Sequence, residues 1–587
     1  MVDWTGNNLM IVQFFLTRAD DFSTLAYITI HMEMPPTATA ASAYQPRAYT
    51  GAPVSLDLAK GWLETCRTSH VLCQAERTPG WRPSRLLRLP VNGVQTTYLM
   101  LREASREEYG LGVEYMTLSH RWAPGQQLQL LTRNHHRLRN EIPIEELKVS
   151  IQHAVTAAQH LAIDYLWVDT LCIIQDDEED RDREIQQMDR VYGNSACNVS
   201  ASEADCNDEG CFYNRDETLV KAFKVRLDAD CSDQARHVIH REWQHSRYIL
   251  DTCVLSRRAW VFQERVLSPR VLSCCKQELQ WECRELEASE TYPVSKPEYA
   301  TWGLFQEPSL KTVILRKTNS TSPWDDVARA REVWRRIVRT YARCALTYPE
   351  DKLRALAGIT HVWQRLHDDE YIAGFWRKSL LRDLLWVRDL YEHPSPPRDD
   401  AVTTRAPAPS WSWASICGPV YFLNDWHTAG VIELMVTLKD VSWQPPVLPP
   451  VQQNSQRGSA HPVQDLIPAL QLCGRPVPAR WAEHPQGSVR KNGYARLMLS
   501  TGVKDADSGK PQSGEDGFLM FDHPSALLPE DIICLPIILN KPSPISKAVS
   551  GLVLTVSIGA SNDSWRLGTF GSDQIAAFDV AEIDLTL

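Results

Sequence analysis

An alternation of strand-like and helix-like segments constrains the fold of this chain most. Compact apolar runs at 115–119, 165–169 and 196–200 are typical of short buried strands. Apolar residues recur at helical spacing over 147–158, between the first two runs, and again over 185–192, between the second and third. Strands that alternate with helices at this spacing predict an α/β fold with a parallel sheet, whose crossover helices cover its two faces.

Polar side chains gather where these predicted strands end. Ser119 and Arg121 lie at the end of the first strand, and Asp169 ends the second. Glu184 follows an acidic loop predicted at 176–182, and Arg265 lies later in the chain among large apolar residues. Such sheets bind ligands beyond the carboxyl ends of their strands, and guanidinium groups match phosphate oxygens. A catalytic cleft and a set of ion pairs that merely satisfy one another are both consistent with this pattern.

Familiar catalytic and metal-binding motifs are missing from the sequence. It contains no G-x-G-x-x-G, P-loop, H-E-x-x-H or G-x-S-x-G pattern. Two sets of cysteines cluster without C-x-x-C spacing: Cys197, Cys206 and Cys211, and Cys253, Cys274, Cys275 and Cys283. His237, His240 and His245 lack a clear cysteine or carboxylate partner. We therefore expect reduced, buried thiols and no metal site.

Charge and hydropathy restrict the partners of the chain. Its net charge of −11 argues against a surface that grips nucleic-acid phosphates, which calls for basic residues. No run approaches the roughly 20 apolar residues that span a bilayer. The first residues carry Asp3 and no basic residue before the apolar run at 9–16, which is a poor signal peptide. We expect a cytoplasmic protein with no nucleic-acid partner and no membrane span.

Three blocks of this chain resemble fungal heterokaryon-incompatibility (HET) domain proteins. The block at 115–122 is similar to the family's opening motif, although His120 and Arg121 replace the commoner Tyr-Cys pair. The blocks at 166–175 and 256–265 closely resemble the central and closing motifs. Upstream, Trp62, Cys66, His70 and Cys73 are similar to the lead-in that often precedes the domain.

The resemblance also organises the rest of the chain. It assigns a lead-in to 56–109, the HET domain to 110–270 and a mainly helical HET-associated region to 271–416. Residues 1–55 are expected to be weakly structured, because 34–46 lacks helical or strand periodicity, although the apolar run within the first 34 residues is consistent with a strand or a helix. Short apolar runs separated by Pro, Gly and Asp predict a β-rich region over 417–587.

The family implies nonself recognition and programmed cell death when genetically different hyphae fuse. HET domains are thought to be distant relatives of TIR domains, and some TIR domains cleave NAD with a glutamate on a helix after a central strand. By this order Glu184 matches the catalytic glutamate, Arg121 is placed to hold the pyrophosphate, and Ser119, Asp169 and Arg265 line the ligand site. NAD is then a substrate, and no bound cofactor is expected.

Other interpretations remain open at this stage. Glu184 is also placed to stabilise a helix N-terminus, where negative charge is favourable. The HET domain is equally consistent with a noncatalytic module that self-associates and signals to an unknown protein partner. A third alternative puts unrelated enzyme chemistry in the C-terminal part.

Overall fold

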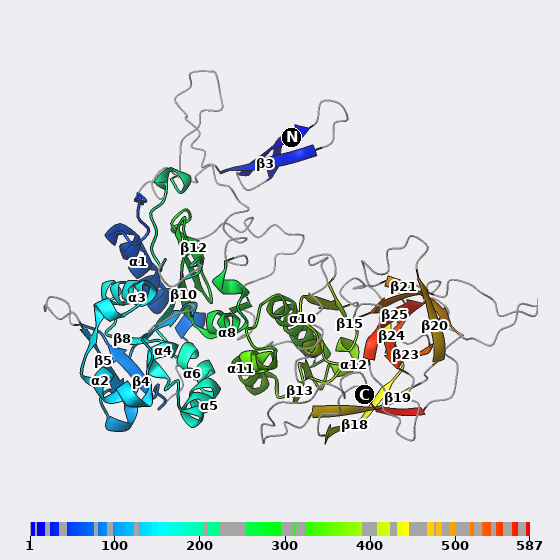
Figure 1. The fold of residues 1–587 in the computed structure, drawn as a ribbon. Helices are drawn as coiled ribbons and strands as arrows, with labels where there is room; N and C mark the ends of the chain where they lie inside the picture. The colour runs from blue at the N-terminus through cyan, green and yellow to red at the C-terminus, as the bar shows by residue number, and fades with distance from the viewer. Residues whose placement is uncertain are drawn as a thin grey trace, which may run out of the picture. The chain divides into compact units, whose positions relative to one another are not determined.

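The computed structural model divides the chain into two compact units, Met1–Arg316 with Ala357–His361, and Lys317–Leu356 with Val362–Leu587 (Figure 1). It describes residues 2–5, 9–17, 24–33, 44–74, 80–90, 98–122, 128–204, 209–221, 253–294, 310–311, 323–389, 408–422, 431–444, 467–474, 477–483, 494–499, 517–521, 531–541, 548–555, 566–572 and 583–586.

A nine-stranded mixed sheet forms the centre of the first unit, in the order β12-β11-β10-β9-β6-β8-β4-β5-β7. Its strands are β4 Arg85–Arg88, β5 Tyr98–Glu103, β6 Met116–Ser119, β7 Ile142–Pro143, β8 Tyr165–Trp167, β9 Cys197–Ser200, β10 Arg270–Cys274, β11 Leu279–Cys283 and β12 Glu287–Ser289. The neighbours β10, β9, β6 and β8 run parallel, whereas the pairs outside them are antiparallel. The predicted α/β class is confirmed, but the prediction of a parallel sheet holds only for these four central strands.

Helices connect the parallel strands, as parallel pairing requires. The helices of this unit are α1 Pro53–Ser69, α2 His135–Asn140, α3 Val149–His160, α4 Asp169–Cys172, α5 Glu178–Gln186, α6 Met188–Gly193 and α8 Ala259–Leu267. Helix α3 joins β6 to β8 and packs on both strands through a buried face that includes Ile151, Ala154 and Ala158. These are the positions that the helical spacing of the sequence selects.

The acidic segment predicted as a loop at 176–182 instead begins a helix. Asp177 is the N-cap of α5, and its side chain accepts a hydrogen bond from the Asp180 amide at 3.1 Å. Carboxylates in a first turn are favourable because they complement the helix dipole, so acidic composition here starts a helix. The helix predicted over 185–192 is divided at Gln187 into α5 and α6.

Two boundaries differ from the sequence expectation. Residues 1–55, expected to be weakly structured, contain an antiparallel sheet of β1 Val2–Thr5, β2 Leu9–Thr17 and β3 Thr24–Glu33, followed by the start of α1. Strands β10 to β12 belong to the nine-stranded sheet, although they lie in the region expected to be mainly helical. The central sheet therefore extends past residue 270.

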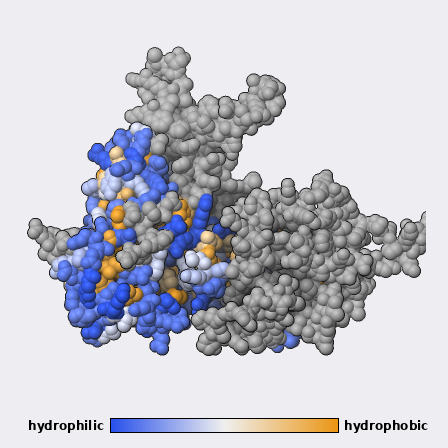
Figure 2. Space-filling model, viewed as in Figure 1, coloured by the Kyte–Doolittle hydropathy of each residue, from blue (hydrophilic) through white to orange (hydrophobic). Residues whose placement is uncertain are grey.

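On the face drawn in Figure 2, hydrophilic residues predominate among the coloured residues, and hydrophobic residues form small separate patches. Among the described residues, no helix combines the length and the apolar character that crossing a membrane requires.

The second unit contains helices followed by strands. Its elements are α10 Pro323–Ala342, α11 Ala357–His367 (whose first five residues belong to the first unit), α12 Leu380–Asp383, β13 Tyr371–Ile372, β14 Phe375–Trp376, β15 Trp386–Arg388, β16 Val420–Phe422, β17 Val431–Leu434, β18 Thr437–Gln444, β19 Ile467–Gly474, β20 Val477–Glu483, β21 Tyr494–Leu499, β22 Gly517–Phe521, β23 Asp531–Lys541, β24 Ala548–Thr555, β25 Arg566–Ser572 and β26 Ile583–Thr586. Buried tryptophans join its helices, since the Trp334 ring lies 5.6 Å from Trp363 and 5.2 Å from Trp376 between centroids. The many tryptophans of the sequence thus serve packing here.

Candidate functional site

A buried polar network joins the carboxyl end of β6 and Asn198 of β9 to helix α8. Ser119, the last residue of β6, donates a hydrogen bond from its hydroxyl to the Glu264 carboxylate of α8. The side-chain amide nitrogen of Asn198, in β9, donates to the Ser119 hydroxyl at 2.9 Å. The Thr117 hydroxyl donates to the side-chain oxygen of Asn198 at 3.0 Å. All four side chains are buried. The network therefore lies at the edge where sheets of this class bind ligands.

Glu264 is the titratable group at the centre of this network. The pKa of its carboxyl is raised to about 7, chiefly by burial and also by the charge of Asp169. Hydrogen bonds from Ser119 and Tyr192, together with the charge of Arg258, act in the opposite direction. A carboxyl with a pKa near neutrality exchanges a proton readily at physiological pH, which is what general acid–base catalysis requires.

A second group of side chains surrounds Asp169, which begins α4 after β8. One carboxylate oxygen of Asp169 accepts a hydrogen bond from the Trp122 indole at 2.7 Å, and the other accepts from the Thr170 amide at 2.7 Å. The Asp169 side chain is 27% exposed, so solvent reaches this group. The site thus pairs a partly exposed carboxylate with the buried Glu264.

His120 lies next to the Asp169 carboxylate. Its Nδ1 is 3.8 Å from Asp169 Oδ1, and neither ring nitrogen has a hydrogen-bond partner among the described residues. Burial lowers the pKa of His120, which favours the neutral ring. Buried polar atoms without hydrogen-bond partners are uncommon in folded proteins, and the two ring nitrogens of His120 are therefore candidates for binding a ligand.

Glu184 lies in α5, beside the first residues of β4. Strand β4 runs antiparallel to β8, which places Ser84 and Arg85 near the carboxyl end of β8. Burial raises the pKa of Glu184, while a hydrogen bond with Ser84 and the charge of Arg85 lower it. Its Oε1 has no hydrogen-bond partner among the described residues and lies 3.7 Å from Arg183 Nε. Glu184 therefore belongs to the same sheet edge but has different neighbours from Glu264.

The two predicted arginines have different surroundings. Arg121 follows His120 and is exposed to solvent. Arg265 donates from Nε to the Glu282 carboxylate of β11 at 2.8 Å, which directs its guanidinium toward that strand. The structure thus brings Ser119 together with Glu264, and Asp169 with His120 and Trp122.

Glu264, Asn198 and Tyr192 are not among the site residues predicted from the sequence. The signal for Glu264 was present, because Val261, Glu264 and Leu267 recur at helical spacing on a buried face. A carboxylate at an apolar position of a helix is costly to bury and marks a functional or paired group. Asn198 gave no comparable signal, since its contact with Ser119 depends on how the strands pair.

Residues 115–264, about a quarter of the chain, match the family model described as Heterokaryon incompatibility protein (HET). The match confirms the resemblance of the three sequence blocks. It begins one residue before β6 and ends at Glu264, so it contains the whole polar network. No curated protein and no solved structure matches the chain.

Proposed function

Because residues 115–264 of this chain are a heterokaryon-incompatibility (HET) domain, we propose that the protein triggers cell death in nonself recognition by cleaving NAD. The bond that breaks joins nicotinamide to ribose. The reaction takes place at the sheet edge that carries Glu264 and Asp169. One observation supports this reading most, namely a buried carboxyl with a pKa of about 7 beside a partly exposed carboxylate.

The two carboxylates have complementary roles in this proposal. Cleavage of an N-glycosidic bond passes through an oxocarbenium-like centre on the ribose, which a nearby negative charge stabilises. Asp169 supplies that charge. Glu264 accepts a proton from the water that attacks the ribose carbon. The electron pair of the broken bond moves to the nicotinamide nitrogen, which leaves as a neutral group and needs no general acid.

The surrounding residues fit a dinucleotide substrate. Exposed Arg121 binds the pyrophosphate in this scheme, because guanidinium groups pair with phosphate oxygens. Ser119 holds Glu264 in place through its hydroxyl, and acts as a positioning residue. Arg265 has no part in this scheme, because its guanidinium bonds Glu282.

Glu184 is the second candidate for the charge-stabilising carboxylate. The distant likeness to TIR domains selects it by its order in the chain, after a strand and at a helix. Its Oε1 supports this assignment, because this oxygen accepts no hydrogen bond from a described residue and can accept one from a ribose hydroxyl. Arg85 and Asp180 nearby form a bidentate ion pair, which also fits a purely structural role for this region.

A noncatalytic signalling module is the alternative function. The network of Ser119, Asn198 and Glu264 ties two strands to α8, and this is also what a structural network does. In that case the domain self-associates and passes its signal to a protein partner. Substitutions that break self-association then abolish cell death, whereas carboxylate substitutions that keep the fold do not.

Nicotinamide release from NAD tests the proposal. The purified full chain is assayed at high concentration, which favours self-association, beside its Glu184→Gln variant and the exposed control Glu146→Gln. We expect the wild type, Glu184→Gln and Glu146→Gln to release nicotinamide at similar rates. A further variant, Asp169→Asn, is expected to release it more slowly. Loss of activity in folded Glu184→Gln alone would transfer the catalytic role to Glu184. Cell killing without any fall in cellular NAD would exclude cleavage and favour the signalling module.

A further inference from the structure

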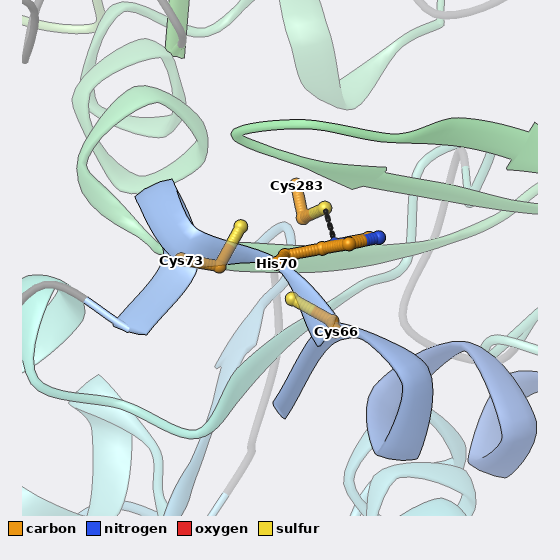
Figure 3. Close-up of side chains that lie close together, drawn as sticks. All are labelled: Cys66, His70, Cys73 and Cys283. Atoms are coloured by element: carbon orange, nitrogen blue, oxygen red, sulfur yellow. Dashed lines mark hydrogen bonds between the residues drawn. The ribbon is translucent and has the colours of Figure 1, made fainter. Parts of the chain in front are cut away.

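Four metal-ligating side chains meet away from the polar network of the HET domain. Cys66, His70, Cys73 and Cys283 each offer one ligand atom, and these atoms all lie within 4.8 Å of one another (Figure 3). The three cysteines are buried and free of disulfides, and His70 is half-buried. Figure 3 shows their side chains converging on one small volume.

The local fold explains why these residues meet. Cys66 lies in the last turn of α1, His70 follows that helix, and Cys73 belongs to a short 3-10 helix, Val71–Gln74. Cys283 is the last residue of β11, and α1 packs against that strand. Three ligands therefore come from one compact turn, and the fourth comes from the sheet.

The spacing of the ligand atoms suits one tetrahedral ion. Zn–S bonds of about 2.3 Å place the sulfurs of a tetrahedral site about 3.7 Å apart. Cys283 Sγ and His70 Nδ1 are already 3.3 Å apart, and small side-chain rotations bring the other atoms to this distance. Ligands of an iron–sulfur cluster bind different iron atoms and stand farther apart.

A buried cation lies beside the cluster and complements the thiolates of a zinc site. The guanidinium of buried Arg270 donates to Cys66 Sγ at 3.0 Å. Its other hydrogen bonds go to the carbonyls of Cys73 and Ala196, and none goes to a described carboxylate. A buried cation needs a nearby anion. Three thiolates, one neutral imidazole and Zn²⁺ carry one net negative charge, which Arg270 balances.

A backbone donor supports the fourth ligand. The Leu286 amide donates to Cys283 Sγ at 3.3 Å. Hydrogen bonds of this kind orient ligands and stabilise the thiolate form in zinc sites. With four protein ligands the coordination is complete, which is typical of structural rather than catalytic zinc.

We propose that Cys66, His70, Cys73 and Cys283 bind one structural Zn²⁺ ion that fastens the segment preceding the HET domain to the strand following it. The ion joins α1 and the 3-10 helix to β11, on the two sides of residues 115–264. No metal site is predicted from the sequence, because three of the ligands lie in the lead-in and Cys283 lies among other cysteines, far from them in the chain. Cys206 and the three histidines considered as metal ligands from the sequence lie outside the described residues.

Metal analysis of the purified full chain tests this proposal independently of any NAD assay. We expect about one zinc per chain by elemental mass spectrometry. Cys66→Ser and Cys283→Ser reduce zinc binding strongly, whereas Cys253→Ser, in a buried cysteine pair elsewhere, keeps the wild-type content. Replacement by Co²⁺ gives the visible absorption of a tetrahedral thiolate site in the wild type, and that absorption is lost in Cys283→Ser.

If the cysteine variants fail to fold, removal of zinc from the wild type tests the proposal. Removal of zinc by a chelator lowers its melting temperature, and added Zn²⁺ restores it. A folded wild-type chain that contains no zinc and gives no thiolate–cobalt absorption would overturn the proposal. Iron with acid-labile sulfide in place of zinc would overturn it too, as would full zinc content in both cysteine variants.

Discussion

The Ser119 hydroxyl donates a hydrogen bond to the Glu264 carboxylate, although 145 positions separate the two residues in the chain. Because β6 ends at Ser119 and α8 carries Glu264, this bond links the first and last parts of the HET domain. It also lowers the pKa of a carboxyl that burial raises. A substitution of Ser119 is therefore expected to change the pKa of Glu264.

Ser119→Ala is expected to shift the pH dependence of NAD cleavage to higher pH. Without the hydroxyl, Glu264 loses a hydrogen bond that favours its charged form, so its pKa rises above about 7. The proposed base then ionises at higher pH, and the rising limb of kcat/KM against pH moves in that direction. Thr156→Ala, on an exposed face of α3, serves as the control. An unchanged profile for Ser119→Ala would separate this hydroxyl from the reaction.

Glu264 is also expected to make the fold less stable as pH rises. Its folded pKa of about 7 exceeds the model-peptide value, so its contribution is fully present at low pH and is lost as pH rises through about 7. The loss is on the order of 3 kcal/mol. Thermal unfolding at pH 5 and pH 8 measures it. We expect the melting temperature of the wild type to fall more between pH 5 and pH 8 than that of Glu264→Gln, whose side chain does not titrate. Equal decreases would contradict a raised pKa of Glu264.

Two ion pairs of the second unit are expected to differ sharply in importance. The Arg335 and Asp383 side chains pair at 2.7 Å and are 1% and 0% exposed. Asp383→Asn leaves the buried guanidinium uncompensated and destabilises the unit by roughly 3–5 kcal/mol. Glu370→Gln breaks an exposed pair with Arg377 and costs less than about 1 kcal/mol. Chemical denaturation compares the two variants, and similar costs would refute the distinction.

The sequence predicted the central strands of the sheet well. Strands β6, β8 and β9 and helix α3 lie where the apolar spacing places them, because each carries its own local pattern. The antiparallel flanks were not predicted, because β4 and β11 contain only four and five residues. Short strands carry too little periodicity to reveal which neighbours they pair with.

The candidate site was predicted in part for the same physical reason. Ser119 and Asp169 follow strands whose positions the sequence reveals, and strand ends mark ligand sites in such sheets. Their contacts with Glu264 and His120 depend on pairing and helix orientation, which no local pattern encodes. Cys283 likewise meets Cys66 only because α1 packs against β11.

The rate of nicotinamide release by Glu264→Gln tests the central claim most directly. The purified full-length wild type, Glu264→Gln and the exposed control Glu146→Gln are compared at pH 8, with circular dichroism to verify that each is folded. We predict that Glu264→Gln is slower than the wild type by about 100-fold or more, because it lacks the proton acceptor, and that the control is unchanged. A folded Glu264→Gln variant that releases nicotinamide at the wild-type rate would contradict the account.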